Sequence, residues 1–299
     1  MCRYNPKIDL VFRKLFGSDE NKDILLSFLN AILEKETKIK ELTIKNPYNL
    51  ADYLSGKASI LDIKAVDENG IWYDIEMQIG EQGHYGKRAL YYWSKIYNGQ
   101  IERAEKYTEL SKTIGIHLLD FDYFKDDTYM RRIVLKDFDT NEIYEELDYE
   151  ELYFIEFKKF KKEYTELKTV LDRWITFMNK AYELEKGKIP REMEREKEIN
   201  KAIEKLERMY FDDKEREIYE GERKLRMDRN EEKRTAEEKG MKKGMEKGME
   251  KGMEKGARNK SLEVAKGMLK DGMDIKIIKK YTGLTEEDIK KIGGSINEK

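Results

Sequence analysis

Two neighbouring stretches of the chain place acidic side chains where they could bind a cation. Residues 60–66 and 71–79 alternate between apolar and polar side chains, and Asp67-Glu68-Asn69-Gly70 separates them. Strict alternation on both sides of a glycine-containing turn predicts a β-hairpin with one buried face. If Gly70 ends a type I turn in the left-handed conformation, residue 67 faces residue 71. Asp62 then lies directly opposite Glu76, with Cβ atoms about 4.5–5.5 Å apart.

Two carboxylates at that distance have a specific chemical consequence. They repel each other, so a proton or a cation should lie between Asp62 and Glu76. Carboxylate oxygens suit Mg²⁺ or Mn²⁺. The alternative is that both residues belong to a polar face that simply meets water, as one face of many antiparallel hairpins does.

The order and spacing of the residues in these stretches resemble those of a known family. Asp62, followed by Glu76-x-Gln78, resembles the PD-(D/E)xK nuclease motif, with Gln78 where a lysine usually stands. More narrowly, the chain resembles the Rpn family of recombination-promoting nucleases and transposases over residues 5–185. The matching pieces are residues 9–17, 61–65 and 74–78, Arg88 with Tyr91-Tyr92, and residues 152–160.

The resemblance implies an α/β fold with an αβββαβ core, a mixed central sheet flanked by helices, and an α-helical C-terminal extension. It also implies a Mg²⁺-dependent DNA endonuclease, active in recombination or transposition, in which Mn²⁺ can substitute. Asp62 and Glu76 would hold the ion, with the main-chain carbonyl of Met77 as a further ligand. Asp9 would join the site from the first helix, or it is only a helix-terminal acid favoured by the helix dipole.

Gln78 departs from the family pattern. An amide can orient a water or bind phosphate, but it carries no positive charge. Lys64, on the same strand face as Asp62, or Lys87 or Arg88 on the next helix, could supply that charge. Arg88 could contact two phosphate oxygens at once, or it could form an ion pair with a hairpin carboxylate. A protein of another class, a non-catalytic DNA-binding or assembly protein that retains the fold, is the alternative to the enzyme.

Periodicity predicts the elements around the hairpin. Helices are expected at residues 9–16, 24–33, 87–106 and 164–182, and strands at 39–46, 113–119, 130–138 and 152–157. Tyr91 is expected in the core. His117, within a nearly continuous apolar strand, is expected to be a hydrogen-bonded core residue. Residues 1–187 would form the nuclease-like domain.

The remaining residues differ in composition. Residues 188–238 predict a charged helical extension, and residues 239–260 repeat a Lys-Gly-Met-Glu pattern with a net charge of +5 (eight Lys or Arg less three Glu). Each interior glycine costs a helix about 1 kcal/mol relative to alanine, so a flexible basic tether is expected; the alternative is a partner-binding helix with a Met face. Residues 261–299 predict a small helical tail, with a capping box at Thr285–Asp288. This tail could bind DNA as a helix-turn-helix does, although its lysines do not settle that.

Composition sets the remaining bounds. The 299 residues carry a net charge of −2, so no global field recruits a polyanion and any DNA-binding surface must be a local patch. No apolar run approaches the roughly 20 residues of a membrane span. One cysteine and two histidines exclude an internal disulfide and leave little for zinc. We expect a cytoplasmic protein with DNA as its partner, and a homodimer is one expected assembly.

Overall fold

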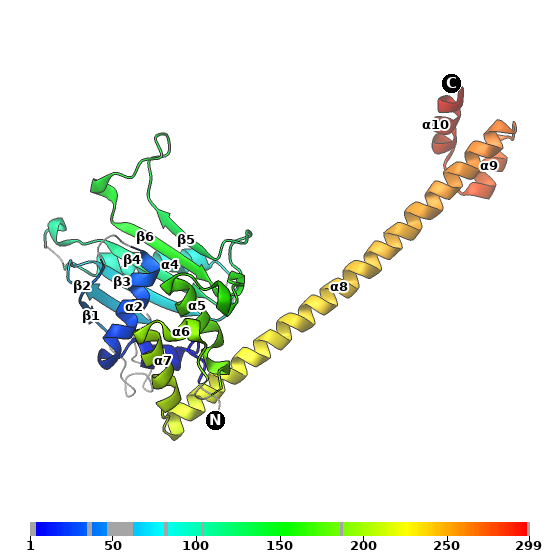
Figure 1. The fold of residues 1–299 in the computed structure, drawn as a ribbon. Coiled ribbons are helices and arrows are strands. Elements are labelled where there is room, and N and C mark those ends of the chain that lie inside the picture. Colours follow the sequence, from blue (N-terminus) through cyan, green and yellow to red (C-terminus); the bar gives the residue numbers. More distant parts are fainter. Residues whose placement is uncertain are drawn as a thin grey trace. The chain divides into compact units, whose positions relative to one another are not determined.

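A six-stranded mixed sheet organises the part of the chain that the computed structural model describes, which is residues 4–34, 38–46, 62–80, 83–102, 105–185 and 188–297. The strand order is β1-β2-β3-β4-β6-β5 (Figure 1). The strands are β1 (Leu42–Ile44), β2 (Ile63–Asp67), β3 (Trp72–Gln78), β4 (Thr113–Leu119), β5 (Met130–Val134) and β6 (Glu150–Glu156). Neighbours from β1 to β3 are antiparallel, β3, β4 and β6 are parallel, and β5 pairs antiparallel at the edge. This arrangement confirms the predicted fold class.

The β2–β3 hairpin has the predicted register. Ile63 pairs with Ile75 and Val66 with Trp72, so Asp62 lies opposite Glu76. Gly70 has a φ of 80°, the left-handed conformation that the turn requires. Asp67 closes the turn, because its carboxylate accepts hydrogen bonds from the N–H groups of Asn69 and Ile71.

One face of the sheet carries the main hydrophobic core. The helices over it are α1 (Asp9–Phe16), α2 (Lys22–Leu33), α5 (Val170–Lys180) and α7 (Lys197–Arg208), with the short α6 (Arg191–Glu194) beside them. Phe16, Phe28 and Trp174 pack together at the centre of this layer. The predicted helix 164–182 is α helical only over α5, where Thr169 and Asp172 form a capping box at its start.

Helix α4 (Tyr85–Asn98) covers the opposite face. Tyr85 and Ala89 pack there against Leu119, Leu152 and Phe154. On the hairpin, the face predicted to be polar is also buried at Asp74 and Glu76, so the prediction of one buried face is wrong at that end. Helix α4 also ends eight residues earlier than predicted, because Gly99 terminates it. The side chain of Gln100 then accepts a hydrogen bond from the N–H of Ser111 and fixes the chain ahead of β4.

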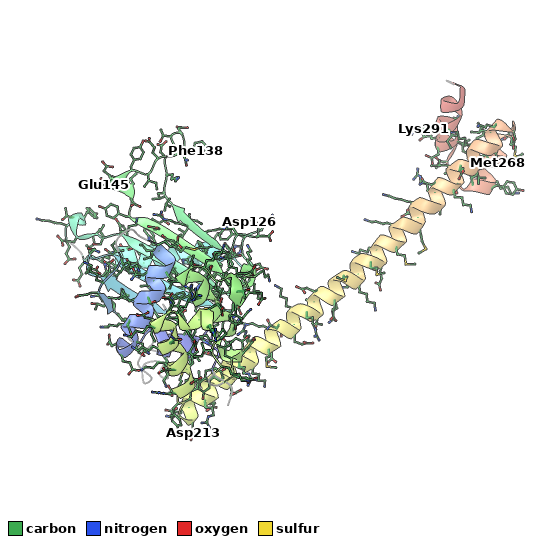
Figure 2. All side chains as sticks on the ribbon, in the orientation of Figure 1. Asp126, Phe138, Glu145, Asp213, Met268 and Lys291 are labelled. Atoms are coloured by element: carbon green, nitrogen blue, oxygen red, sulfur yellow. The ribbon has the colours of Figure 1, made fainter. Side chains whose placement is uncertain are left out.

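Two predicted strands are shorter in the structure. The first runs from Leu42 to Ile44, and β5 ends at Val134. Beyond β5 the chain leaves the sheet in the long connection to β6, where Phe138 is 98% exposed (Figure 2). Because no other apolar side chain in the described part of the chain covers Phe138, burial does not favour extending β5 to residue 138.

Helix α8 runs without interruption from Asp213 to Lys270. It passes from one compact unit, Met1–Met227, into a second, Asp228–Lys299. The predicted flexible conformation of residues 239–260 is therefore wrong. Lys and Glu residues three positions apart, such as Lys243 and Glu246, can offset part of the glycine cost. The methionines of the repeat are exposed, as the alternative of a helix with a Met face predicted.

The end of the chain forms a small helical unit, in which Figure 2 labels Met268 and Lys291. The end of α8, α9 (Ile275–Thr282) and α10 (Glu286–Asn297) enclose a core of Ala265, Ile278, Leu284 and Ile289. Gly283 ends α9 with a φ of 69°. The predicted capping box is present in part, because the Thr285 hydroxyl accepts a hydrogen bond from the N–H of Asp288.

Candidate active site

Asp62 and Glu76 meet at the open end of the β2–β3 hairpin. The N–H of Asp62 donates to Glu76 Oε1 at 3.2 Å, and the N–H of Met77 donates to Asp62 Oδ2 at 2.7 Å. Both carboxylates are buried. The sequence pattern predicted this pair, and the structure brings it together.

Asp74 is a third carboxylate on the same face of β3. It lies two residues before Glu76, opposite Lys64 on β2. Asp74 is fully buried, and neither of its oxygens has a hydrogen-bond partner within the described residues. The ammonium of Lys64 lies 4.5 Å from the centroid of the Trp72 ring. The alternation had placed Asp74 on the polar face, but only its burial under α4 marks it as a member of the site.

Burial and mutual repulsion make these acids hard to ionise. Burial raises the pKa of Asp62 well above its ordinary value, and the charges of Glu76 and Asp9 raise it further. Burial and the neighbouring Asp74 raise the pKa of Glu76 to about 8. Burial and Asp62 raise the pKa of Asp74 to about 8 as well. These acids therefore tend to keep their protons at neutral pH, and a bound cation would favour their ionised forms.

Arg13 connects helix α1 to this pair. Its Nη2 lies 2.7 Å from Asp62 Oδ1, and its Nε lies 2.8 Å from Asp9 Oδ1. Sequence reasoning missed Arg13. The only available signal was the four-residue spacing of Asp9 and Arg13, which places both on one side of a helix. Asp9 thus lies beside the site and its carboxylate contacts Arg13, whereas its part in the metal site stays a prediction of the resemblance.

Gln78 and Arg88 lie together on the other side of Glu76. Gln78 Nε2 donates to the carbonyl of Gly80 at 3.1 Å, and Gln78 Oε1 accepts from Arg88 Nη1 at 3.3 Å. Arg88 Nη2 is 3.7 Å from Glu76 Oε2, so the alternative of an ion pair with a hairpin carboxylate fits this structure. Lys87 is exposed on α4. Arg88 thus contacts Gln78, which stands in the place of the usual lysine.

The sequence also predicted that two residues near α4, His117 and Tyr91, lie in the core. His117 is a buried core residue as predicted, and its Nδ1 shares a hydrogen bond of 3.2 Å with the Tyr85 hydroxyl. Burial, together with Arg88, lowers the pKa of His117 to about 3, so the ring is neutral. The expectation for Tyr91 is wrong, because its side chain is 60% exposed on the outer side of α4.

The oxygen atoms of this site suit a hard divalent cation, but only a few side chains supply them. Among the described residues, no three His, Cys, Asp or Glu side chains are grouped to hold one ion together. The facing Asp62 and Glu76 offer two carboxylates, and the unpartnered oxygens of Asp74 add nearby negative charge. Mg²⁺ commonly binds proteins through one or two carboxylates and keeps several waters. The residues present are compatible with such an ion.

The fold is that of the PD-(D/E)XK nuclease class, and comparison with family models agrees. Residues 6–236 match the PD-(D/E)XK nuclease family transposase model, so the chain belongs to that family. Residues 258–294 match the C-terminal helix-turn-helix domain of the Rpn/YhgA-like nuclease family, which confirms the resemblance to Rpn proteins. No curated protein and no solved structure matches the chain. None of the described helices is long and apolar enough to cross a membrane.

Proposed function

We propose that this protein is a Mg²⁺-dependent DNA endonuclease that hydrolyses phosphodiester bonds, with a role in recombination or transposition. The observation that carries the proposal is the buried, facing pair of Asp62 and Glu76. Burying two acids together is costly unless a proton or a cation compensates them. Because this buried pair destabilises the metal-free fold and the chain belongs to a nuclease family, the pair supports the proposal of a metal-dependent site.

In this proposal Asp62, Glu76 and the main-chain carbonyl of Met77 hold the ion, which Mn²⁺ can replace. When bound, a divalent ion supplies Lewis acidity toward the scissile phosphate. Asp9 as a further ligand stays a prediction of the resemblance. The remaining chemistry belongs to the polar side chains around the pair.

Arg88 and Gln78 share the task of the usual lysine. Gln78 is held by Gly80 and Arg88, so its amide has a defined orientation. From there it would bind a water or a phosphate oxygen. Arg88 supplies the positive charge that Gln78 lacks, and a guanidinium can contact two phosphate oxygens. Lys64 contributes from β2, and Lys87 is placed to contact DNA from the exposed side of α4.

Cleavage of supercoiled plasmid DNA in Mg²⁺ tests the assignment. Asp62→Ala and Glu76→Ala should each abolish nicking. Thermal stability should stay equal or rise in Glu76→Ala, because it removes one member of a repelling pair, whereas Asp62→Ala also removes the acceptor of Arg13 and should be less stable than Glu76→Ala. Glu151→Gln is a matched control, since Glu151 is a buried acid on β6 that pairs with Lys112 and Arg132 instead. Parental cutting by both site variants would refute the assignment. A parent that cuts with neither Mg²⁺ nor Mn²⁺ would favour the non-catalytic DNA-binding or assembly protein.

The C-terminal part is proposed to bind DNA and to organise the enzyme. In this division residues 1–187 carry the chemistry, residues 188–238 extend them, residues 239–260 add positive charge, and residues 261–299 contact DNA. The family's helix-turn-helix domain at residues 258–294 supports the last assignment.

We also propose a homodimer that forms through the repeat of α8. Gly240 and Met241 begin two rows that recur every four residues, and the four methionines are 61–77% exposed. Glycine lets helices approach closely, and methionine adapts to irregular apolar contacts. Replacing Met241, Met245, Met249 and Met253 with Gln should convert a dimer to a monomer in analytical ultracentrifugation. A monomeric parent would refute self-association.

A further inference from the structure

Arg13 is a cation that the fold itself places in the carboxylate site. The Arg13 side chain is only 11% exposed, and its guanidinium contacts Asp62 and Asp9 at 2.7 and 2.8 Å. Asp62 lies 49 residues from Arg13 in sequence, so the contact joins α1 to the start of β2. A buried arginine held by two acids is a strong electrostatic element rather than a solvated surface charge.

Asp62 has both oxygens engaged in this state. Oδ1 accepts from Arg13, and Oδ2 accepts from the N–H of Met77. A divalent ion between Asp62 and Glu76 needs an oxygen of Asp62. It would also carry two positive charges close to the guanidinium. Ion and guanidinium therefore compete for the same carboxylate.

We propose that Arg13 is a built-in counter-ion of the metal-free site, and that a divalent cation binds by displacing the guanidinium from Asp62. This inference rests on the metal site of the proposed function. Asp9 keeps the displaced guanidinium through its contact with Nε, which makes Asp9 a positioning residue for Arg13 rather than a ligand. The competition stabilises the site without metal and lowers its metal affinity.

Isothermal titration of the full-length protein with Mn²⁺, without DNA, tests this competition. Arg13→Gln should bind Mn²⁺ at least about tenfold more tightly than the parent, because a nearby like charge is removed. Arg13→Lys should bind severalfold more tightly, since an ammonium lacks the planar fork with which the guanidinium spans Asp9 and Asp62. Arg173→Gln is the matched control, because Arg173 is a buried arginine paired with Glu196 elsewhere, and its Mn²⁺ affinity should equal the parent's.

Asp9 is tested in two backgrounds. If Asp9 only holds Arg13, Asp9→Asn should weaken Mn²⁺ binding more in the parent than in Arg13→Gln, where only its nearby charge is lost. If Asp9 is a ligand, it should weaken binding equally in both, which would overturn the positioning role. Should Arg13→Gln not fold, as judged by thermal denaturation in EDTA, Arg13→Lys replaces it as the second background.

The outcomes separate this inference from the proposed function. Unchanged or weaker Mn²⁺ binding in the Arg13 variants, with binding lost in Glu76→Gln, overturns the role of Arg13 and leaves the metal site standing. Parental binding in Glu76→Gln overturns the metal site itself. Tighter binding in both Arg13 variants, together with loss in Glu76→Gln, supports both.

Discussion

Replacing Asp74 with asparagine should stabilise the metal-free protein, and the gain should grow with pH. Burial and Asp62 raise the pKa of Asp74 to about 8, while an unfolded chain releases this proton near pH 4. Between these values the native state binds a proton that the unfolded state has lost. The free energy of unfolding therefore falls as pH rises through this window. Asparagine has nearly the same shape and no proton to lose, and no hydrogen bond of the carboxylate is sacrificed.

The magnitude follows from the pKa shift. Each unit corresponds to about 1.4 kcal/mol, so the full shift would be worth about 4 kcal/mol at pH 7. The repulsion between Asp62 and Asp74 is relieved when either residue keeps its proton. We therefore assign only about half of this free energy to Asp74 alone. We expect a gain of about 2 kcal/mol at pH 7 and below about 1 kcal/mol at pH 5. For a domain of this size about 2 kcal/mol raises the melting temperature by about 4–8 °C.

Thermal and urea denaturation in EDTA from pH 5 to 8.5 measure this difference. Asp172→Asn is the control of opposite sign. Burial alone would raise the pKa of Asp172, but hydrogen bonds from Lys162, Thr169 and Lys168 lower it. Its contribution is present above the ordinary pKa and is lost only in acid, so this variant should be less stable by a nearly constant amount. A difference between Asp74→Asn and the parent that does not grow with pH would refute the reasoning.

Three other predictions concern the missing lysine, the repeat and the core. Gln78→Lys should hold or raise plasmid cleavage and partly rescue Lys64→Ala, with a coupling of roughly 0.5–3 kcal/mol in a double-mutant cycle of cleavage rates. Additive effects would contradict the idea that residue 78 and Lys64 can supply the same positive charge. Deleting residues 240–260 should weaken DNA binding at low salt and flatten the plot of log K against log salt. An unchanged slope would leave this segment a spacing or assembly role. Gly115→Ala should lower the melting temperature, because its Cβ would lie 2.8 Å from Leu152 Cδ2 and 3.1 Å from His117 Nε2. Overpacking of this kind costs about 1–3 kcal/mol, whereas Gly221→Ala on α8 meets nothing within 4 Å and should not destabilise.

Local sequence patterns determined the central pair of the site. Side chains in a strand alternate with period two, and the turn that Gly70 permits allows one register. These two facts are enough to place Asp62 opposite Glu76 from the sequence alone, and the folded hairpin has that register. The C-terminal helices were predictable for a similar reason, since the apolar spacing around Ile278 and Ile289 and the cap at Thr285 are local signals.

Tertiary packing decided what surrounds the pair. Alternation cannot tell a polar face that meets water from one covered by a helix, so the burial of Asp74 under α4 had no signal in the sequence. The spacing of Asp9 and Arg13 was visible, but their contact with Asp62 depends on how α1 lies against the sheet. The end of α4 at Gly99 depends on hydrogen bonds between Gln100 and the later residue Ser111. In helix α8 the local signal was misleading, because the low helix propensity of the repeated glycines argued against a helix that the structure contains. Short-range patterns thus fixed the acids that face each other, whereas the positions of Arg13, Arg88 and Asp74 around them depend on contacts between distant segments.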